Sequence, residues 1–171
     1  MHFCAKGERD LKEALASVLP SVGYRGSIDK FMRYWFEQDS HINHAVLKVI
    51  KVLAQHPRVK LYLATGQEHY RAAYLWDDLG FKDLFLNIFY SARLGYTKSE
   101  PGFFERINEE LGMASAIARG DKPLFFDDSE AVVVLACASG WDAHVLEDAG
   151  TLFAHPKVKS LLEKCDTPEQ G

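Results

Sequence analysis

The chain has 171 residues, of which 47% are hydrophobic, and its 20 basic and 24 acidic side chains give a formal net charge of −4. This length and composition predict one ordinary domain with its own core and room for a small appended piece. The charges are mixed in sign without a basic face, which argues against nucleic acid as a partner. No apolar run approaches the length of a membrane span. We therefore expect a soluble, cytoplasmic protein that binds neither nucleic acid nor membrane.

The three cysteines, Cys4, Cys137 and Cys165, are odd in number, far apart and without metal-ligand spacing. This pattern predicts free thiols in a reducing compartment. Cys137 falls within an apolar helical stretch, where we expect a small core residue. Residues 167–171 have the composition of a loose tail.

The first 55 residues predict helices and no strand. Apolar residues on one helical face predict a helix over 8–19 that ends at Pro20. Ser27 is a candidate helix cap, and residues 31–36 are rich in aromatic side chains that either pack in a core or line a substrate entrance. A further helix is predicted over residues 42–53.

From residue 59 onward, strands and helices alternate. Compact apolar runs predict strands, and longer periodic runs that end near glycine or begin at proline predict helices. The predicted strands are 59–64, 85–90, 123–126 and 143–146, and the predicted helices are 67–79, 101–111, 130–139 and one around 158–162. This alternation is typical of an α/β protein with a Rossmann-like parallel sheet flanked by helices.

Polar residues follow three of these strands, where ligands of parallel sheets bind. Thr65 and Gly66 come after the first strand and before a helix, so the hydroxyl and the free helix N–H groups form a candidate anion site; alternatively, Thr65 only caps the helix. Asp127 and Asp128 follow the third strand, and paired carboxylates are typical ligands of a hard cation. The alternative is that Asp128 or Ser129 caps the next helix while Asp127 is solvated.

Lys98 lies in the loop after the second strand, just before the helix that begins at Pro101. A lysine in such a loop is most often simply solvated. Taken together with the other strand-end residues, however, its ammonium and the Thr65 hydroxyl can hold a phosphate, while the carboxylates of Asp127 and Asp128 hold a Mg²⁺ ion that bridges to it. The combination indicates a phosphoryl-transfer site.

Three segments carry a family resemblance: LATGQEHYRAAYLWDDLGF, YSARLGYTKSEPGFFERI and LFFDDSEAVVVLACASGWDAHVL. In order and spacing they resemble the second, third and fourth motifs of the haloacid dehalogenase-like (HAD) hydrolases, over about residues 45–150. The resemblance implies a HAD-like core over residues 46–166 and a helical cap over residues 1–45 that shapes substrate choice. It also implies magnesium-dependent hydrolysis of a small phosphorylated metabolite.

By the same resemblance, Thr65 with Gly66 binds the phosphoryl group, Lys98 neutralises its charge, and Asp127 and Asp128 are magnesium ligands. Ser99 stands where the third motif usually has a proline. Asp127 is the stronger candidate ligand because it is closer to the strand end, and Asp128 can act indirectly, by contacting a group that itself binds the ion.

The first motif of the family, an Asp-x-Asp on the central strand that provides the nucleophile and the general acid, has no counterpart in this sequence. No apolar strand precedes Asp10, and Asp29 and Asp39 fall among predicted helices. Three explanations stay open. We favour first that the chain starts at an internal position and lacks its natural N-terminus. Next comes a degenerate family member that binds without turnover, and last a strand supplied by another chain. The alternative function is therefore a non-catalytic phosphate, metal or protein binder, and a dehalogenase comes last.

The same departure has a structural consequence. Without the central strand, the sheet is expected to have an unpaired edge on either side of a gap, which is costly for a buried parallel sheet. We therefore expect a chain that is less stable than an ordinary domain of this size, or a homo-oligomer.

Overall fold

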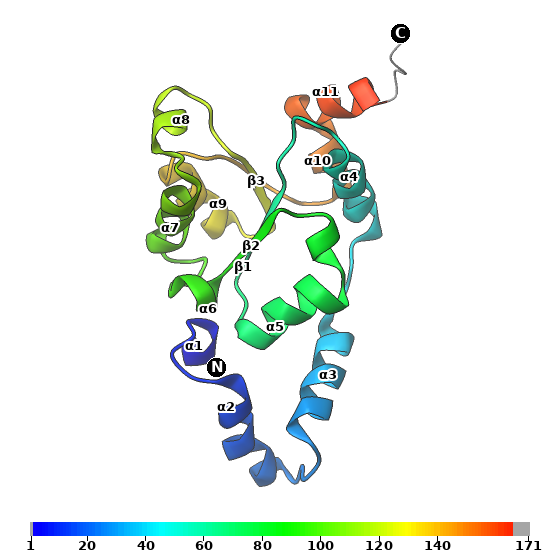
Figure 1. Cartoon of the computed structure of the whole chain (residues 1–171), viewed down its shortest axis with the longest axis vertical. Helices are drawn as coiled ribbons and strands as arrows, with labels where there is room; N and C mark the ends of the chain where they lie inside the picture. The colour runs from blue at the N-terminus through cyan, green and yellow to red at the C-terminus, as the bar shows by residue number, and fades with distance from the viewer. Residues whose placement is uncertain (1, 166–171) are drawn as a thin grey trace.

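A computed structural model of the chain describes residues 2–165 and shows an α/β architecture (Figure 1). The predicted tail, residues 167–171, lies outside the described residues. Strands and helices alternate from residue 62 onward, as the sequence predicts. No helix within residues 2–165 combines the length and the apolar character needed to cross a bilayer.

The N-terminal residues form a helical lobe away from the strands (Figure 1). It contains α1 (His2–Ala5), α2 (Leu11–Val18), a 3₁₀ turn η1 (Leu19–Val22) and α3 (Ile28–Asp39). The side chain of Asp10 caps α2 by accepting the Glu13 N–H, and Ser27 caps α3 as predicted. The α-helix ends at Val18, just before Pro20 as predicted, and Pro20 lies in the first turn of η1, where its missing N–H leaves no hydrogen bond unmade.

The lobe has its own apolar cluster, formed by the buried residues Cys4, Leu11, Leu15, Leu19, Met32 and Phe36. Of the aromatic segment, Phe31 and Trp35 pack against this cluster, whereas Tyr34 is exposed. The aromatic stripe therefore serves mainly to pack the lobe.

Four short parallel strands form two separate pairs. β1 (Tyr62–Thr65) pairs with β2 (Asn87–Tyr90), and β3 (Leu124–Asp127) pairs with β4 (Asp142–Val145). The single sheet that the sequence predicts is thus divided into two two-stranded sheets. Within the described residues, each strand has one partner and one open edge.

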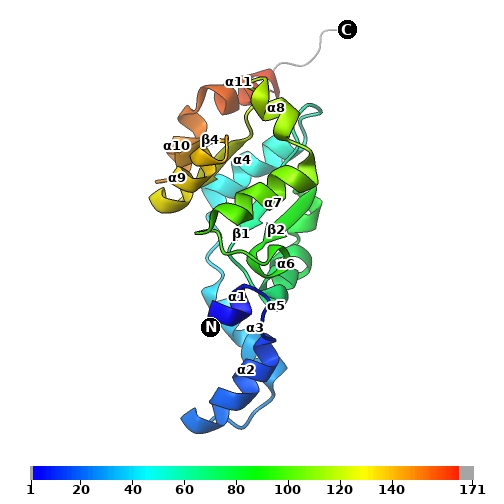
Figure 2. The same cartoon turned by 90° about the vertical axis from the view of Figure 1, so that its left-hand side faces the viewer.

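The two pairs are halves of one layer, because both contribute to the same clusters above and below it. On one face of the layer, a single apolar cluster contains or contacts Tyr62 and Ala64 of β1, Phe89 of β2, Phe125 of β3 and Ala143 of β4. On the other face, the residues from both halves are Leu61, Leu124, Phe126 and Leu146. In Figure 2, β1 lies on the side of β2 that faces β4. All four residues of β1 and the first three of β3 are only half-buried, as expected for strands with an open edge.

Helices cover both faces of the layer (Figures 1 and 2). Their bounds are α4 (His44–Ala54), α5 (His69–Ala73), a π-helical turn η2 (Tyr74–Asp78), a 3₁₀ turn η3 (Phe81–Asp83), α6 (Ser91–Leu94), α7 (Pro101–Leu111), α8 (Ala114–Ala118), α9 (Glu130–Ala138), α10 (Ala149–Ala154) and α11 (Pro156–Cys165). The sequence does not predict α6, α8 or α10, and the predicted 67–79 helix is divided between α5 and η2.

The interpretation of Cys137 as a core residue is wrong. Val132, Val133 and Ala136 point from α9 into the protein, so Cys137 falls on the outer side of this helix and is exposed. Apolar residues lie all around α9, and even Val134 is 61% exposed. Because no side of this helix is polar, the sequence does not indicate which side is buried.

Candidate active site

The strand ends gather the predicted polar residues at one edge of the layer. Thr65 is the last residue of β1, Asp127 is the last residue of β3, and Lys98 lies in the loop between α6 and α7 that follows β2. The loop after β1 is joined to α6, the short helix after β2, by a hydrogen bond from the Ala92 N–H to the Gln67 carbonyl, at 3.1 Å. Parallel pairing brings these carboxyl ends to the same side.

An ion pair between Lys98 and Asp127 is the centre of this edge. The Lys98 ammonium donates to Asp127 Oδ2, and the side chains of the two residues are 19% and 6% exposed. Asp127 Oδ1 accepts the Ser129 N–H at 3.1 Å. Asp127 belongs to the strand rather than to the loop, because it is in register with Val145 and its carbonyl accepts the Leu146 N–H at 2.8 Å. The alternative that Asp127 is merely solvated is therefore wrong.

Gly66 borders this ion pair from the β1 side. A Cβ atom built on Gly66 would lie 3.8 Å from Lys98 Cδ and 3.9 Å from Ser91 Oγ. Ser91 is completely buried, and its hydroxyl has no hydrogen-bond partner among the described residues. An orphaned buried hydroxyl is rare and costly, and this one lies close to Gly66.

The sequence interpretation missed Ser91. The only signal was a serine directly after the predicted strand 85–90, a position equivalent to that of Thr65 after its own strand. The residue begins α6, a helix of four residues that is too short to show a period in the sequence.

Thr65 does not cap the next helix. The cap of α5 is Glu68, whose carboxylate accepts the N–H groups of Tyr70, at 2.8 Å, and Arg71. Burial of Glu68 raises the pKa of its carboxyl, against the lowering effect of these hydrogen bonds. The Thr65 hydroxyl is therefore not required by α5, and the residue is half-buried at the strand end.

Asp128 is exposed beside the buried Asp127. The N-cap position of α9 is Ser129, and its side chain makes no capping hydrogen bond. The alternative capping role of Asp128 or Ser129 is therefore not observed. The structure brings Lys98 and Asp127 into contact and places Gly66 close to the Lys98 side chain, while Thr65 and Asp128 lie next to Gly66 and Asp127 in the chain.

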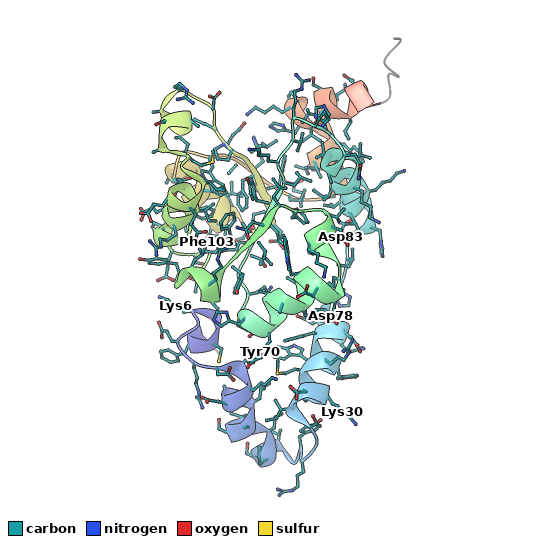
Figure 3. All side chains as sticks on the ribbon, viewed as in Figure 1. Lys6, Lys30, Tyr70, Asp78, Asp83 and Phe103 are labelled. Atoms are coloured by element: carbon teal, nitrogen blue, oxygen red, sulfur yellow. The ribbon has the colours of Figure 1, made fainter. Side chains whose placement is uncertain are left out.

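The loop that carries Lys98 is held by Glu100. Its carboxylate accepts the Thr97 N–H at 2.7 Å and the Thr97 hydroxyl at 3.0 Å, and it pairs with the Lys6 ammonium at 2.9 Å. These contacts, led by the Thr97 N–H, lower the pKa of Glu100 to about 2. Lys6 comes from the N-terminal lobe, and Figure 3 shows it where α1 meets α6. The lobe thus reaches the loop beside the site, which the sequence did not predict.

The N-terminal aspartates have other roles. Asp10 accepts the Tyr70 hydroxyl at 2.7 Å as well as capping α2, while Asp29 pairs with Lys12 at 2.7 Å and Asp39 with Arg71 at 3.4 Å. None of the three lies on a strand, as predicted.

Comparison with known proteins supports the fold. No protein-family model matches the sequence, and no curated protein matches it. Among solved structures, a HAD family enzyme from Bacteroides thetaiotaomicron, crystallised as its magnesium complex, is similar with a TM-score of 0.70 at 19% identity. The match covers 90% of this chain and 79% of that one.

A second structure of that enzyme is an aspartate-to-alanine variant in complex with magnesium and inorganic phosphate. It gives a TM-score of 0.69 at 20% identity, over 89% of this chain and 79% of the other. The sequence motifs and the structural likeness agree, and the protein has the α/β fold of the HAD family enzymes.

Proposed function

We propose that this protein belongs functionally to the HAD-type phosphatases and contributes the phosphate- and magnesium-binding part of a site that hydrolyses a small phosphate ester through an aspartyl-phosphate. The observation that carries the proposal is the partly buried Lys98–Asp127 ion pair beside Gly66, at the carboxyl ends of parallel strands. Residues 1–45 act as the cap and residues 46–166 as the core.

The carboxylates fit a magnesium ion. Each oxygen of Asp127 accepts one hydrogen bond, from Lys98 or from Ser129, and a carboxylate oxygen can accept a further partner. Asp128 adds a second, accessible carboxylate. Hard oxygen ligands with room for water are what Mg²⁺ prefers, and the bound ion would neutralise charge on a phosphoryl group.

The remaining groups suit a phosphate. Lys98 supplies a cation, Thr65 and Ser91 supply hydroxyl donors, and Gly66 has no side chain to block their approach. Lys98 would exchange part of its contact with Asp127 for the phosphate once a metal ion shares the carboxylate. The solved HAD family structure with magnesium and phosphate supports this combination of ligands.

The nucleophile is proposed to lie on an extended segment between β1 and β3. Both strands have an open edge within residues 2–165, and the two pairs already share apolar clusters above and below the layer. A segment that pairs with both edges in parallel would end beside Lys98 and Asp127. An aspartate at that end would meet the bound phosphoryl group.

A second candidate function is binding without turnover. It is favoured by the engagement of Asp10, Asp29 and Asp39 in caps and ion pairs of the helical lobe, which leaves none of them at the strand ends. In this case the site would bind phosphate and magnesium but could not form a covalent intermediate.

The experiment compares the chain with its Asp127→Asn variant. Release of p-nitrophenol from p-nitrophenyl phosphate is measured with and without Mg²⁺, and Mg²⁺ binding is measured by calorimetry. Magnesium-dependent turnover that disappears in the variant supports the phosphatase. Magnesium binding without turnover, again lost in the variant, supports the second candidate. Absence of both magnesium binding and turnover, or an unchanged Asp127→Asn variant, refutes the assigned site.

A further inference from the structure

A second group of potential metal ligands lies on β4, away from the strand-end site. Asp142 and His144 are two residues apart on this strand and so project from the same face. His155, between α10 and α11, reaches the same place. One ligand atom from each of these side chains lies within 4.8 Å of the others.

The surrounding structure positions the three side chains. Asp142 and His144 are in register with Leu124 and Phe126 of β3. The Phe126 ring contacts the His155 ring edge-on at 5.6 Å, and the two imidazole rings are 4.7 Å apart between centroids. The His144 Nε2 atom lies 2.9 Å from Asp142 Oδ1. Packing therefore brings the three residues together without help from the loops near Asp127.

His155 has an unused ligand atom. Its Nδ1 is buried and has no hydrogen-bond partner among the described residues. The neutral form of an imidazole offers the lone pair of such a nitrogen to a metal ion. A buried imidazole nitrogen without a partner costs free energy, and a metal ion would satisfy it.

Asp142 provides the negative charge. Its Oδ2 pairs with the Lys157 ammonium at 2.7 Å, which lowers the pKa of the carboxyl. Lys157 is 56% exposed on a flexible stem, so it can move aside or remain on Oδ2 while Oδ1 binds a cation. A carboxylate with a fixed second partner is a common arrangement around metal ions.

The ligand types indicate the metal. Two imidazoles and one carboxylate suit Zn²⁺ and its first-row neighbours, whereas Mg²⁺ and Ca²⁺ prefer oxygen ligands alone. In tetrahedral zinc sites with bonds of about 2.0–2.1 Å, the ligand atoms are about 3.3 Å apart. The ligand atoms of Asp142, His144 and His155 lie within 4.8 Å of one another, so each distance has to shorten by about 1.5 Å at most. Rotation of the side chains can achieve this.

We propose that Asp142, His144 and His155 form a binding site for a divalent first-row transition-metal ion, zinc by preference, that is separate from the candidate active site. Asp142 and His144 are in register with Leu124 and Phe126, which lie three residues and one residue before Asp127, so their side chains project from the face of the layer opposite to that of Asp127. The ion would join β4 to the start of α11 and so tie the C-terminal helices to the strand layer.

The test is titration of the chelator-treated protein with Zn²⁺ by calorimetry, together with the visible absorption of bound Co²⁺. One zinc ion per chain is expected, and His144→Ala and His155→Ala are each expected to weaken binding at least about tenfold. The matched control is His41→Ala, which removes an exposed histidine outside the cluster and should leave the affinity unchanged.

Two further variants separate this site from the first. Asp127→Asn should leave zinc affinity unchanged, and Lys157→Gln should increase it because a competing cation is removed. Absence of zinc binding, an equal loss in His41→Ala, or a loss in Asp127→Asn would overturn the proposal. If His155→Ala fails to fold, the wild-type Co²⁺ spectrum decides, since an all-oxygen octahedral spectrum contradicts imidazole ligation.

Discussion

Removal of the Lys98 ammonium tests how much the Lys98–Asp127 ion pair contributes to the stability of the folded protein. Lys98→Met keeps most of the apolar stem and leaves the carboxylate of Asp127, whose side chain is 6% exposed, with only the Ser129 N–H. Breaking a fully buried ion pair costs about 3–5 kcal/mol, and the 19% exposure of the Lys98 side chain lets water replace part of its contact. We expect a loss of about 2–4 kcal/mol in the free energy of unfolding, or about 5–15 °C in Tm.

Urea unfolding measures this loss, and a double-mutant cycle assigns it. Asp127→Asn removes the charge at nearly constant shape, so the double variant should regain much of the stability lost in Lys98→Met. The control is Lys82→Met, which breaks the exposed Lys82–Asp77 pair and should cost under about 1 kcal/mol. An equal, small cost for both lysine variants would refute the reasoning. Saturating Mg²⁺ should reduce the Lys98→Met loss if the ion binds Asp127.

Two other predictions concern the loop beside the site and the packing of α9. The pKa of Glu100 is about 2 against an ordinary 4.5, so its ionised form stabilises the folded state above pH 4.5 and this contribution is lost as the pH falls toward 2. Urea midpoints of wild type and Glu100→Gln should therefore differ at pH 6 and converge near pH 2; a difference that persists unchanged at low pH would contradict this. Gly140→Ala introduces a Cβ atom 2.6 Å from Ile117 Cγ2 at a φ of 90°, and should cost about 1–3 kcal/mol. Gly112→Ala, also at positive φ but with nothing within 4 Å, is the matched control and should cost less; equal costs would show that the clash relaxes freely.

The parallel strands and their polar ends could be predicted because both are local in the sequence. Each strand appears as a short apolar run, and Thr65 and Asp127 follow directly from where such runs end. The bounds were less accurate. The run that begins at Val59 is longer than β1, because Val59 and Leu61 pack in an apolar cluster without joining the strand ladder.

Non-local features were not predictable in the same way. The contact of Lys6 with Glu100 spans 94 positions, and no pattern in the sequence joins them. The approach of His155 to β4 depends on how α10 and α11 turn back, and α10 itself, with six residues, shows no clear period. The orphaned hydroxyl of Ser91 became visible only once its burial and its distance from Gly66 were known.

The sequence also predicted the gap in the sheet, through the absence of the first family motif, but not how the two halves stay together. Within residues 2–165 no strand pairing joins β1–β2 to β3–β4, so the connection depends on side chains. Apolar clusters provide it above and below the layer, and at the carboxyl edge it is provided by Lys98 and Asp127, one from each half. The ion pair is therefore both the centre of the candidate active site and a link between the halves. A phosphate that binds Lys98, or a metal ion that binds Asp127, acts on the contact that holds these halves at that edge, so occupancy of the site and cohesion of the layer should change together.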